Sequence, residues 1–209
     1  MALKTKVYIC GINNLSDARY CAGMGVELMG FNLIPESPEY ITPDKFKEIT
    51  GWISGVYIVG EFGNSTPEVI ESIVNAIELD YIEVSDPKTL TPLKVFGIPL
   101  IFSLDISLYN HAQLEIILNT YQISVEYFIL NASQPLEKGY WNKVMEYAQL
   151  YPLLIAVNVG PEGINELLDN TQLSGIVLNG GHENKPGLKD FDELASILEA
   201  IEIDDAPNS

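Results

Sequence analysis

Short apolar runs recur along the chain at an even pace, and polar or turn-forming residues separate them. The runs are rich in Val, Ile, Leu and Tyr and mostly unbroken, which is typical of parallel strands that are buried on both faces. They predict strands at residues 4–10, 28–33, 56–59, 81–84, 100–104, 127–130, 153–157 and 176–178.

Helical patterns fill the intervals between these strands. One begins at Thr66-Pro67 and places Val69, Ile70 and Ile73 on one face. Other helices are expected from the N-cap Ser16, after Asp86-Pro87, near Leu108, and over 140–150, 161–168 and 190–201. The prolines at 35 and 38 mark a loop. Eight strands that alternate with eight helices in about 200 residues predict an α/β fold, a (β/α)8 TIM barrel. We expect a single domain over 1–203 and a polar tail over 204–209.

Composition limits the setting in which the protein works. The 209 residues are 47% apolar and 19% charged, as in ordinary globular domains. No apolar run approaches the roughly 18 residues that span a bilayer. Two cysteines without an export signal predict free thiols in a reducing compartment, and therefore a cytoplasmic protein.

The charge balance narrows the choice of partners. The formal net charge is −18, and Arg19 is the only arginine. Nucleic acids and anionic membranes need a basic surface, so we expect neither as a partner. A small-molecule ligand remains, and the sequence leaves the oligomeric state open.

Cys10 is the first candidate for chemistry, because it ends the first predicted strand and precedes Gly11. Groups at the carboxyl ends of parallel strands line the ligand crevice. A buried, unreactive cysteine is an equally good interpretation of this residue. Glu61 is expected in a strand-end loop as a solvated charge, and His111 and His182 as isolated surface residues. No metal-ligand spacing occurs, and no cofactor is implied.

Two ends of the chain resemble the phosphoribosylanthranilate isomerase family. The first match is Cys10-Gly11-Ile12, Asp17-Ala18 and Ser37-Pro38-x-Tyr40-Ile41, and the second is the stretch from Gly180 to Asp190. The resemblance implies a TIM barrel and an enzyme of tryptophan biosynthesis. Its reaction is the Amadori rearrangement of an aminoaldose phosphate to an aminoketose phosphate, with a phosphorylated ligand and no cofactor.

The resemblance also assigns roles to residues. Cys10 falls at the position of the general base, and neighbours can lower a thiol pKa toward neutrality. Asn131 falls at the position of the general acid, an aspartate in the family. An amide cannot donate that proton, and losing a positioned acid typically costs 10²–10⁴-fold in rate.

Substrate recognition differs from the family pattern at further positions. Glu39 replaces the family's arginine for the anthranilate carboxylate, and Val177 replaces an aspartate of the last strand. Asn179, Gly180 and Gly181 match the loop that offers backbone amides to phosphate, which we expect to bind at roughly millimolar strength.

Three hypotheses follow from these residues. The first is an isomerase of this family with a rearranged site. The second is a non-catalytic or repurposed barrel that binds another small molecule. The third is a different enzyme that uses Cys10 with Glu83, Asp105 or other carboxylates at strand ends.

Overall fold

The computed structural model describes residues 2–135, 139–156, 160–169, 172–180, 183–185, 188–189 and 192–203. The expected polar tail, 204–209, and the residues Gly181 and His182 lie outside the described residues.

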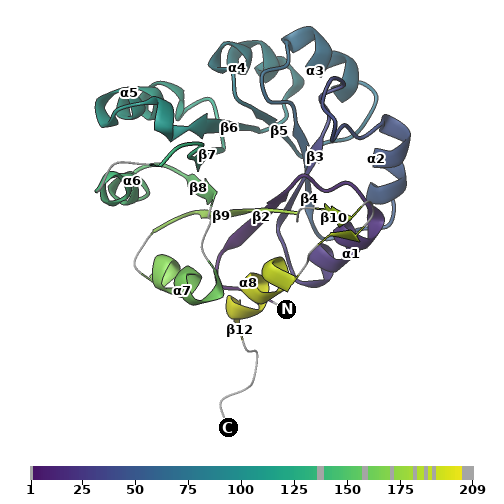
Figure 1. Cartoon of the computed structure of the whole chain (residues 1–209). Helices are drawn as coiled ribbons and strands as arrows, with labels where there is room; N and C mark the ends of the chain where they lie inside the picture. The colour runs from purple at the N-terminus through teal and green to yellow at the C-terminus, as the bar shows by residue number, and fades with distance from the viewer. Residues whose placement is uncertain are drawn as a thin grey trace.

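Eight parallel strands form a closed barrel, which confirms the predicted fold (Figure 1). Closure occurs where the first barrel strand pairs with the last, with Lys6 opposite Gly175 and Cys10 opposite Asn179. The strands are β2 (Lys6–Cys10), β3 (Leu28–Asn32), β4 (Tyr57–Glu61), β5 (Tyr81–Val84), β6 (Leu100–Asp105), β7 (Tyr127–Asn131), β8 (Leu153–Ala156) and β9 (Gly175–Asn179).

Helices surround the strands in Figure 1. They are α1 (Leu15–Gly23), α2 (Pro43–Thr50), α3 (Pro67–Val74), α4 (Pro87–Leu93), α5 (His111–Tyr121), α6 (Tyr140–Tyr147), α7 (Pro161–Asp169) and α8 (Asp192–Ala200), with 3-10 turns η1 (Lys94–Phe96) and η2 (Ile106–Leu108). The expected N-cap Ser16 is wrong, because the Asn14 side chain accepts the hydrogen bond from the Asp17 amide. Likewise, α5 begins at His111 rather than near Leu108, because Asn110 and Gln113 form a capping box.

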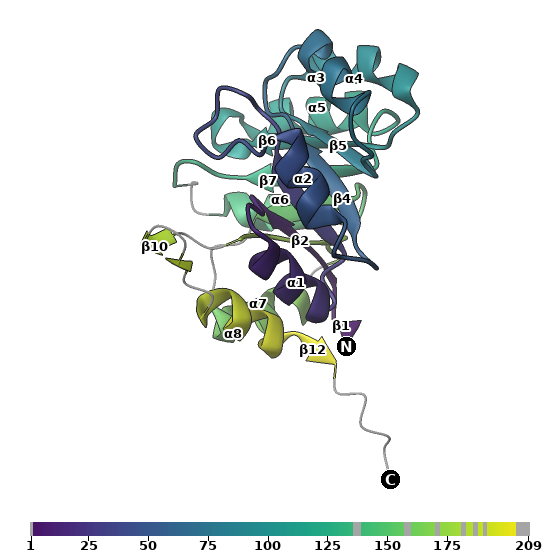
Figure 2. The ribbon, with the colours of Figure 1, turned by 90° about the vertical axis from the view of Figure 1, so that its right-hand side faces the viewer.

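Short antiparallel strands that the apolar pattern does not reveal lie at the two ends of the barrel. At the amino end, β1 (Ala2–Leu3) pairs with β12 (Glu202–Ile203). The strands β10 (Glu183–Lys185) and β11 (Leu188–Lys189) pair in the segment after β9. Figure 2 shows β10 projecting on one side and β1 and β12 on the other.

Alternation along each strand divides the side chains between two cores. On β2, Val7 and Ile9 pack outward in the large cluster beneath the helices, whereas Tyr8 packs inside the barrel. The inner cluster also contains one buried side chain from most other strands: Leu28, Val59, Ile101, Ile129, Leu154 and Val177. The same alternation turns the last residue of several strands toward the mouth of the barrel.

Candidate active site

A cavity of about 500 Å³ opens at the carboxyl ends of the strands. Its walls are Tyr8, Cys10, Glu83, Ser103, Ile129, Asn131, Ala132, Ala156, Val177 and Asn179. The structure therefore brings together Cys10, Asn131 and Asn179, as the sequence predicts, and places Val177 beside them. This is the end of a parallel barrel at which ligands bind.

Cys10 lies between β9 and the carboxylates of β4 and β5. Its thiol lies 2.9 Å from Asn179 Oδ1 and 3.4 Å from the Leu178 carbonyl oxygen, and its one proton can be donated to either acceptor. Burial raises its pKa well above the usual value, and the charges of Glu61, Glu83 and Glu39 raise it further. The expectation that neighbours lower this pKa is therefore wrong, because the neighbours are acidic.

Glu61, expected as a solvated charge, instead ends β4 and points into the barrel mouth. Its Oε1 accepts hydrogen bonds from the Tyr8 hydroxyl at 2.9 Å and from the Gly11 amide at 3.0 Å. On its other side, the Tyr8 hydroxyl contacts Glu83 Oε2 at 2.6 Å. One phenol thus bridges two carboxyl groups that are 22 positions apart in the sequence.

Gly30 on β3 provides the space for this arrangement. A Cβ atom at this position would lie 1.9 Å from Glu61 Oε1 and 2.4 Å from the Tyr8 hydroxyl. The backbone of Gly30 is not in the left-handed region, so steric space rather than conformation requires glycine here. Gly30 is thus part of the site, although it carries no chemical group.

A second link joins Glu83 to the position of the family acid. The Ser103 hydroxyl hydrogen-bonds the Glu83 carboxylate, and Asn131 Nδ2 donates to Ser103 Oγ at 3.3 Å. Side-chain interactions therefore link Asn131 on β7, through Ser103 and Glu83, to Tyr8 and Glu61. We call these five residues the mouth network.

Electrostatics favour protonated carboxyl groups in this network. Burial raises the pKa of Glu61 to about 8, and the Glu83 charge contributes, although hydrogen bonds from Tyr8 and Gly11 oppose the shift. Burial also raises the pKa of Glu83 against the hydrogen bonds from Tyr8 and Ser103. The pKa of Tyr8 lies well above its usual range because of burial and the two carboxylates. The network can therefore hold a carboxylic proton at neutral pH.

The predicted phosphate loop is described only at its start. The Gly180 amide donates to the Cys10 carbonyl at 2.9 Å, so it is engaged and does not point to an anion as expected. Gly181 lies outside the described residues, and Asn179 Oδ1 accepts from the Cys10 thiol. Amide donors to a phosphate at this loop would thus come from residues after Gly180.

Two other acidic residues at this end have separate roles. Burial acts to raise the pKa of Asp105, but hydrogen bonds from Ser107 and Ser133 outweigh it and lower the pKa. Asp105 is thereby held as the cap of the η2 turn. Glu39 is exposed in the loop after β3, yet its charge reaches both Cys10 and Glu61.

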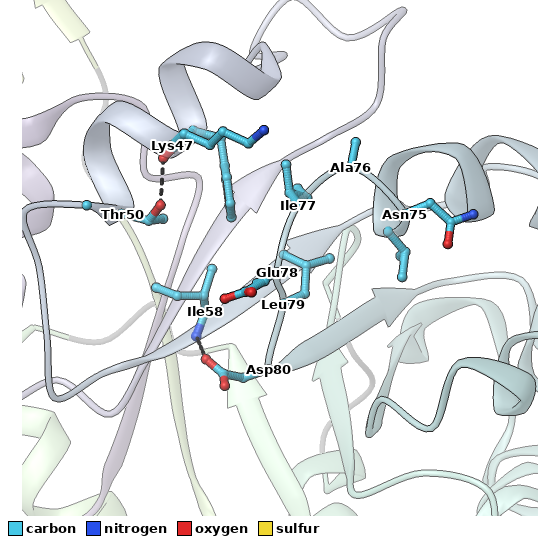
Figure 3. Close-up of a pocket in the computed structure, with 12 residues that line it drawn as sticks. Lys47, Thr50, Ile58, Asn75, Ala76, Ile77, Glu78, Leu79 and Asp80 are labelled. Atoms are coloured by element: carbon cyan, nitrogen blue, oxygen red, sulfur yellow. Dashed lines mark hydrogen bonds between the residues drawn. The ribbon is translucent and has the colours of Figure 1, made fainter.

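The structure contains other hollows. The larger, about 920 Å³, lies between α2, the end of α3 and the amino ends of β4 and β5. Figure 3 shows Asp80 there, whose carboxylate accepts from the Ile58 amide at 2.7 Å. A third, of about 470 Å³, is lined by His111 and Tyr140. The expectation of a surface His111 is wrong, since its ring is partly buried and stacks on Tyr140 with centroids 4.2 Å apart.

Among the described residues, no group of three or more His, Cys, Asp or Glu side chains is placed to hold a metal ion. None of the helices described combines the length and apolar character needed to cross a bilayer.

Fold and cavity together define a barrel protein with a thiol and two linked carboxyl groups at the carboxyl ends of its strands. The family model for N-(5′-phosphoribosyl)anthranilate isomerase matches residues 7–200, and the chain belongs to this family. The isomerase of Syntrophus aciditrophicus is 27% identical over 204 residues, which cover 94% of this chain and 87% of that protein. The isomerase of Microcystis aeruginosa is 27% identical over 210 residues, which cover 94% of this chain and 97% of that protein.

Solved structures agree on the fold. The phosphoribosylanthranilate isomerase of Thermotoga maritima superposes with a TM-score of 0.78 at 24% identity, covering 94% of this chain and 98% of that one. A phosphoribosylanthranilate isomerase in complex with reduced 1-(o-carboxyphenylamino)-1-deoxyribulose 5-phosphate superposes with a TM-score of 0.77 at 24% identity, covering 94% of this chain and 98% of that one. These likenesses fix the architecture and leave the chemistry to the residues of the cavity.

Proposed function

We propose that this chain is an isomerase of tryptophan biosynthesis that converts N-(5′-phosphoribosyl)anthranilate by an Amadori rearrangement. The observation that carries the proposal is the cavity in which Cys10, Asn131 and Asn179 meet, in a chain of this family. A cytoplasmic location belongs to the same proposal and is consistent with two free thiols.

In this proposal Cys10 removes the C2′ proton as general base. Its raised pKa means that the thiolate is scarce at neutral pH, so the rate should rise with pH until another group limits it. Asn179 accepts from the Cys10 thiol and orients it. Asn131 occupies the acid position and contributes only hydrogen bonding. The phosphate is proposed to bind at the loop that follows Gly180, through amides other than that of Gly180.

The test is a fluorescence assay of purified protein with N-(5′-phosphoribosyl)anthranilate. We expect turnover that depends on Cys10, so that Cys10→Ala abolishes it whereas Cys21→Ala retains it. Cys21 is a matched control because it is fully buried in α1, away from the cavity. A wild type without turnover would contradict the proposal.

A second candidate is a repurposed barrel that binds a cationic ligand. It is favoured by Glu39, which stands where the family's arginine is expected and whose charge acts on the cavity. No lysine or arginine is among the described residues that line the cavity. The acidic mouth therefore attracts an ammonium group and repels the anthranilate carboxylate.

A matched pair of small probes separates the two candidates. Anthranilate and 2-aminobenzylamine differ in that a carboxylate is replaced by an aminomethyl group, which is cationic at neutral pH. Tighter binding of the amine by at least about tenfold in calorimetry would support the repurposed barrel. Tighter binding of anthranilate would support the isomerase.

A further inference from the structure

We infer that Glu83 is the general acid of this site, and that a single carboxylic proton, shared with Glu61 through Tyr8, resupplies it. This inference rests on the proposed isomerase function and adds a residue that the family pattern does not provide. It addresses the chemical gap at Asn131, whose amide cannot donate a proton to the ring oxygen of the substrate.

The geometry itself requires an extra proton. The Tyr8 hydroxyl lies 2.9 Å from Glu61 Oε1 and 2.6 Å from Glu83 Oε2, but it has one proton to donate. If both carboxyl groups were ionised, one of these contacts would join two oxygens without a hydrogen between them. A proton on one carboxyl group removes the conflict, because that group donates to Tyr8 while Tyr8 donates to the other.

The remaining contacts show which of the two carboxyl groups faces the cavity. Glu61 is removed from the cavity wall, accepts the Gly11 amide and has a pKa of about 8. Glu83 lines the cavity and accepts hydrogen bonds from both Tyr8 and Ser103. Glu61 likewise accepts from two donors, so the resting state is one carboxylic proton held by Glu61 and Glu83 together across the neutral Tyr8 phenol.

Transfer through Tyr8 then moves the proton to the cavity. Glu61 gives its proton to the Tyr8 oxygen as Tyr8 gives its own to Glu83, so Glu61 becomes ionised and Glu83 neutral while Tyr8 is unchanged. Glu83 next protonates the ring oxygen while the lone pair of the substrate nitrogen forms a C1′=N bond; the C1′–O bond breaks and its electron pair remains on the oxygen, which leaves C1′ as a hydroxyl. The C2′ proton removed later by the base restores the proton count.

The groups that face this relay explain its proton affinity. They are Tyr8 and Cys10 from β2, Glu39 from the loop after β3, Glu61 from β4, Glu83 from β5 and Ser103 from β6. All the charged members are acidic, so each ionisation makes the next one harder. Asn131 completes the chain through Ser103 without adding a charge.

The first test measures the proton without any substrate. Protein labelled with ¹³C at the glutamate side-chain carboxyl carbon is titrated by NMR, and Glu61→Gln and Glu83→Gln assign the two resonances. We expect a resonance with a midpoint of about 8 that is absent in Glu61→Gln. Titration of both groups below about pH 5, the range of ordinary carboxyl groups, would overturn the relay.

The second test measures turnover. Glu83→Gln should lower kcat by about 10²–10⁴-fold, the usual cost of a lost general acid. Asn131→Asp in the Glu83→Gln background should restore at least about tenfold, because it returns an acid to the family position. Full activity of Glu83→Gln, in protein shown to be folded by circular dichroism, would overturn the assignment.

Tyr8 and Glu61 act through Glu83, so they are positioning residues and are tested by the pH profile. In the wild type the rise of kcat with pH should level off above about pH 8, because the loss of the shared proton there offsets the further ionisation of Cys10. In Glu61→Gln this levelling should begin at lower pH, because Glu83 loses its partner carboxyl group. In Tyr8→Phe it should begin at higher pH, because the hydrogen bonds that are lost lower the pKa of both carboxyl groups in the wild type. A merely structural defect would cause neither shift. An unchanged alkaline limb in both variants would overturn their role.

Glu27→Gln is the matched control, because it neutralises a carboxylate at the opposite end of the barrel and should leave kcat unchanged. A wild type inactive on N-(5′-phosphoribosyl)anthranilate would overturn the proposed function and the acid role of Glu83. The substrate-free titration would still decide whether the shared proton exists, so the two failures are distinguishable.

Discussion

The two ends of the barrel interior differ in how their charged side chains are paired: the amino end holds an ion pair, and the carboxyl end holds two carboxyl groups. At the amino end Lys6 pairs with Glu27 at 2.5 Å and lies over the Tyr127 ring, 5.9 Å from its centroid. At the carboxyl end Tyr8 bridges Glu61 and Glu83, and no cation among the described residues lines the cavity.

The difference shows how one barrel separates stability from proton chemistry. At the amino end the Glu27 hydrogen bond raises the pKa of Lys6, so Lys6 keeps its charge across the neutral range. At the carboxyl end the pKa of Glu61 is raised to about 8, so this end gains or loses a proton near neutral pH. Paired charges fix a protonation state, whereas crowded like charges make it responsive.

The largest effect is expected when a cationic side chain is introduced at the carboxyl end of the barrel, where none is present among the described residues that line the cavity. Glu39→Arg restores the side chain that the family pattern places there, and it should bind the anthranilate carboxylate. A hydrogen bond to a charged group contributes about 1.5–3 kcal/mol, so KM should fall about 10–100-fold. Glu36→Arg, three positions earlier in the same exposed loop, is the control for net charge. Equal KM changes in both variants would refute a specific contact.

Glu61→Gln should change how the free energy of unfolding depends on pH. The folded-state pKa of Glu61 is about 8, against about 4.3 in an unfolded chain. Between these values the folded protein binds the extra proton, so its stability falls as pH rises and the whole penalty is present above pH 8. Glutamine mimics the protonated form and should stabilise the protein at pH 9, with little effect at pH 4. The full shift corresponds to about 5 kcal/mol, and partial exposure reduces the expected gain to on the order of 2 kcal/mol.

Urea unfolding at several pH values measures this effect. The wild-type curve should slope downward between about pH 5 and 8, and the Glu61→Gln curve should be flatter. Parallel curves for the two proteins would mean that Glu61 is ionised in the folded state throughout this range.

The smallest effect is expected at the amino end. Glu27→Gln removes one partner of an ion pair whose side chains are 35% and 36% exposed. Exposed pairs contribute about 0.2–1 kcal/mol, so the free energy of unfolding should fall by about 0.5 kcal/mol. Urea unfolding in low and high salt checks this, since screening should shrink the difference. A loss above about 2 kcal/mol would show that the pair is effectively buried.

The sequence predicts the barrel because its strands are apolar on both faces. Each predicted strand has a counterpart, and Cys10, Asn131 and Asn179 end their strands as expected. The boundary of β4 is the informative error, since the apolar run stops at Val59 whereas the strand continues through Gly60 to Glu61. A glycine followed by a glutamate is typical of a loop, and nothing local shows that Tyr8, 53 positions earlier, approaches that carboxylate.

One signal could have identified the missed residues. Inward positions alternate along barrel strands, so an inward Cys10 implies an inward Tyr8, and an inward Tyr81 implies an inward Glu83. The pKa values of Glu61 and Glu83 cannot be predicted from the sequence, because they depend on how closely charged groups from different strands approach each other. The family position of Asn131 likewise does not reveal its link through Ser103 to Glu83.

Gly30 bears on any attempt to transplant this chemistry. A designer who copies Tyr8, Glu61 and Glu83 into another barrel would transfer three side chains and still fail wherever a neighbouring strand carries a Cβ atom at the position of Gly30. That atom would lie 1.9 Å from the copied Glu61 carboxylate. The minimal graft is therefore four positions on four strands, one of which contributes only empty volume.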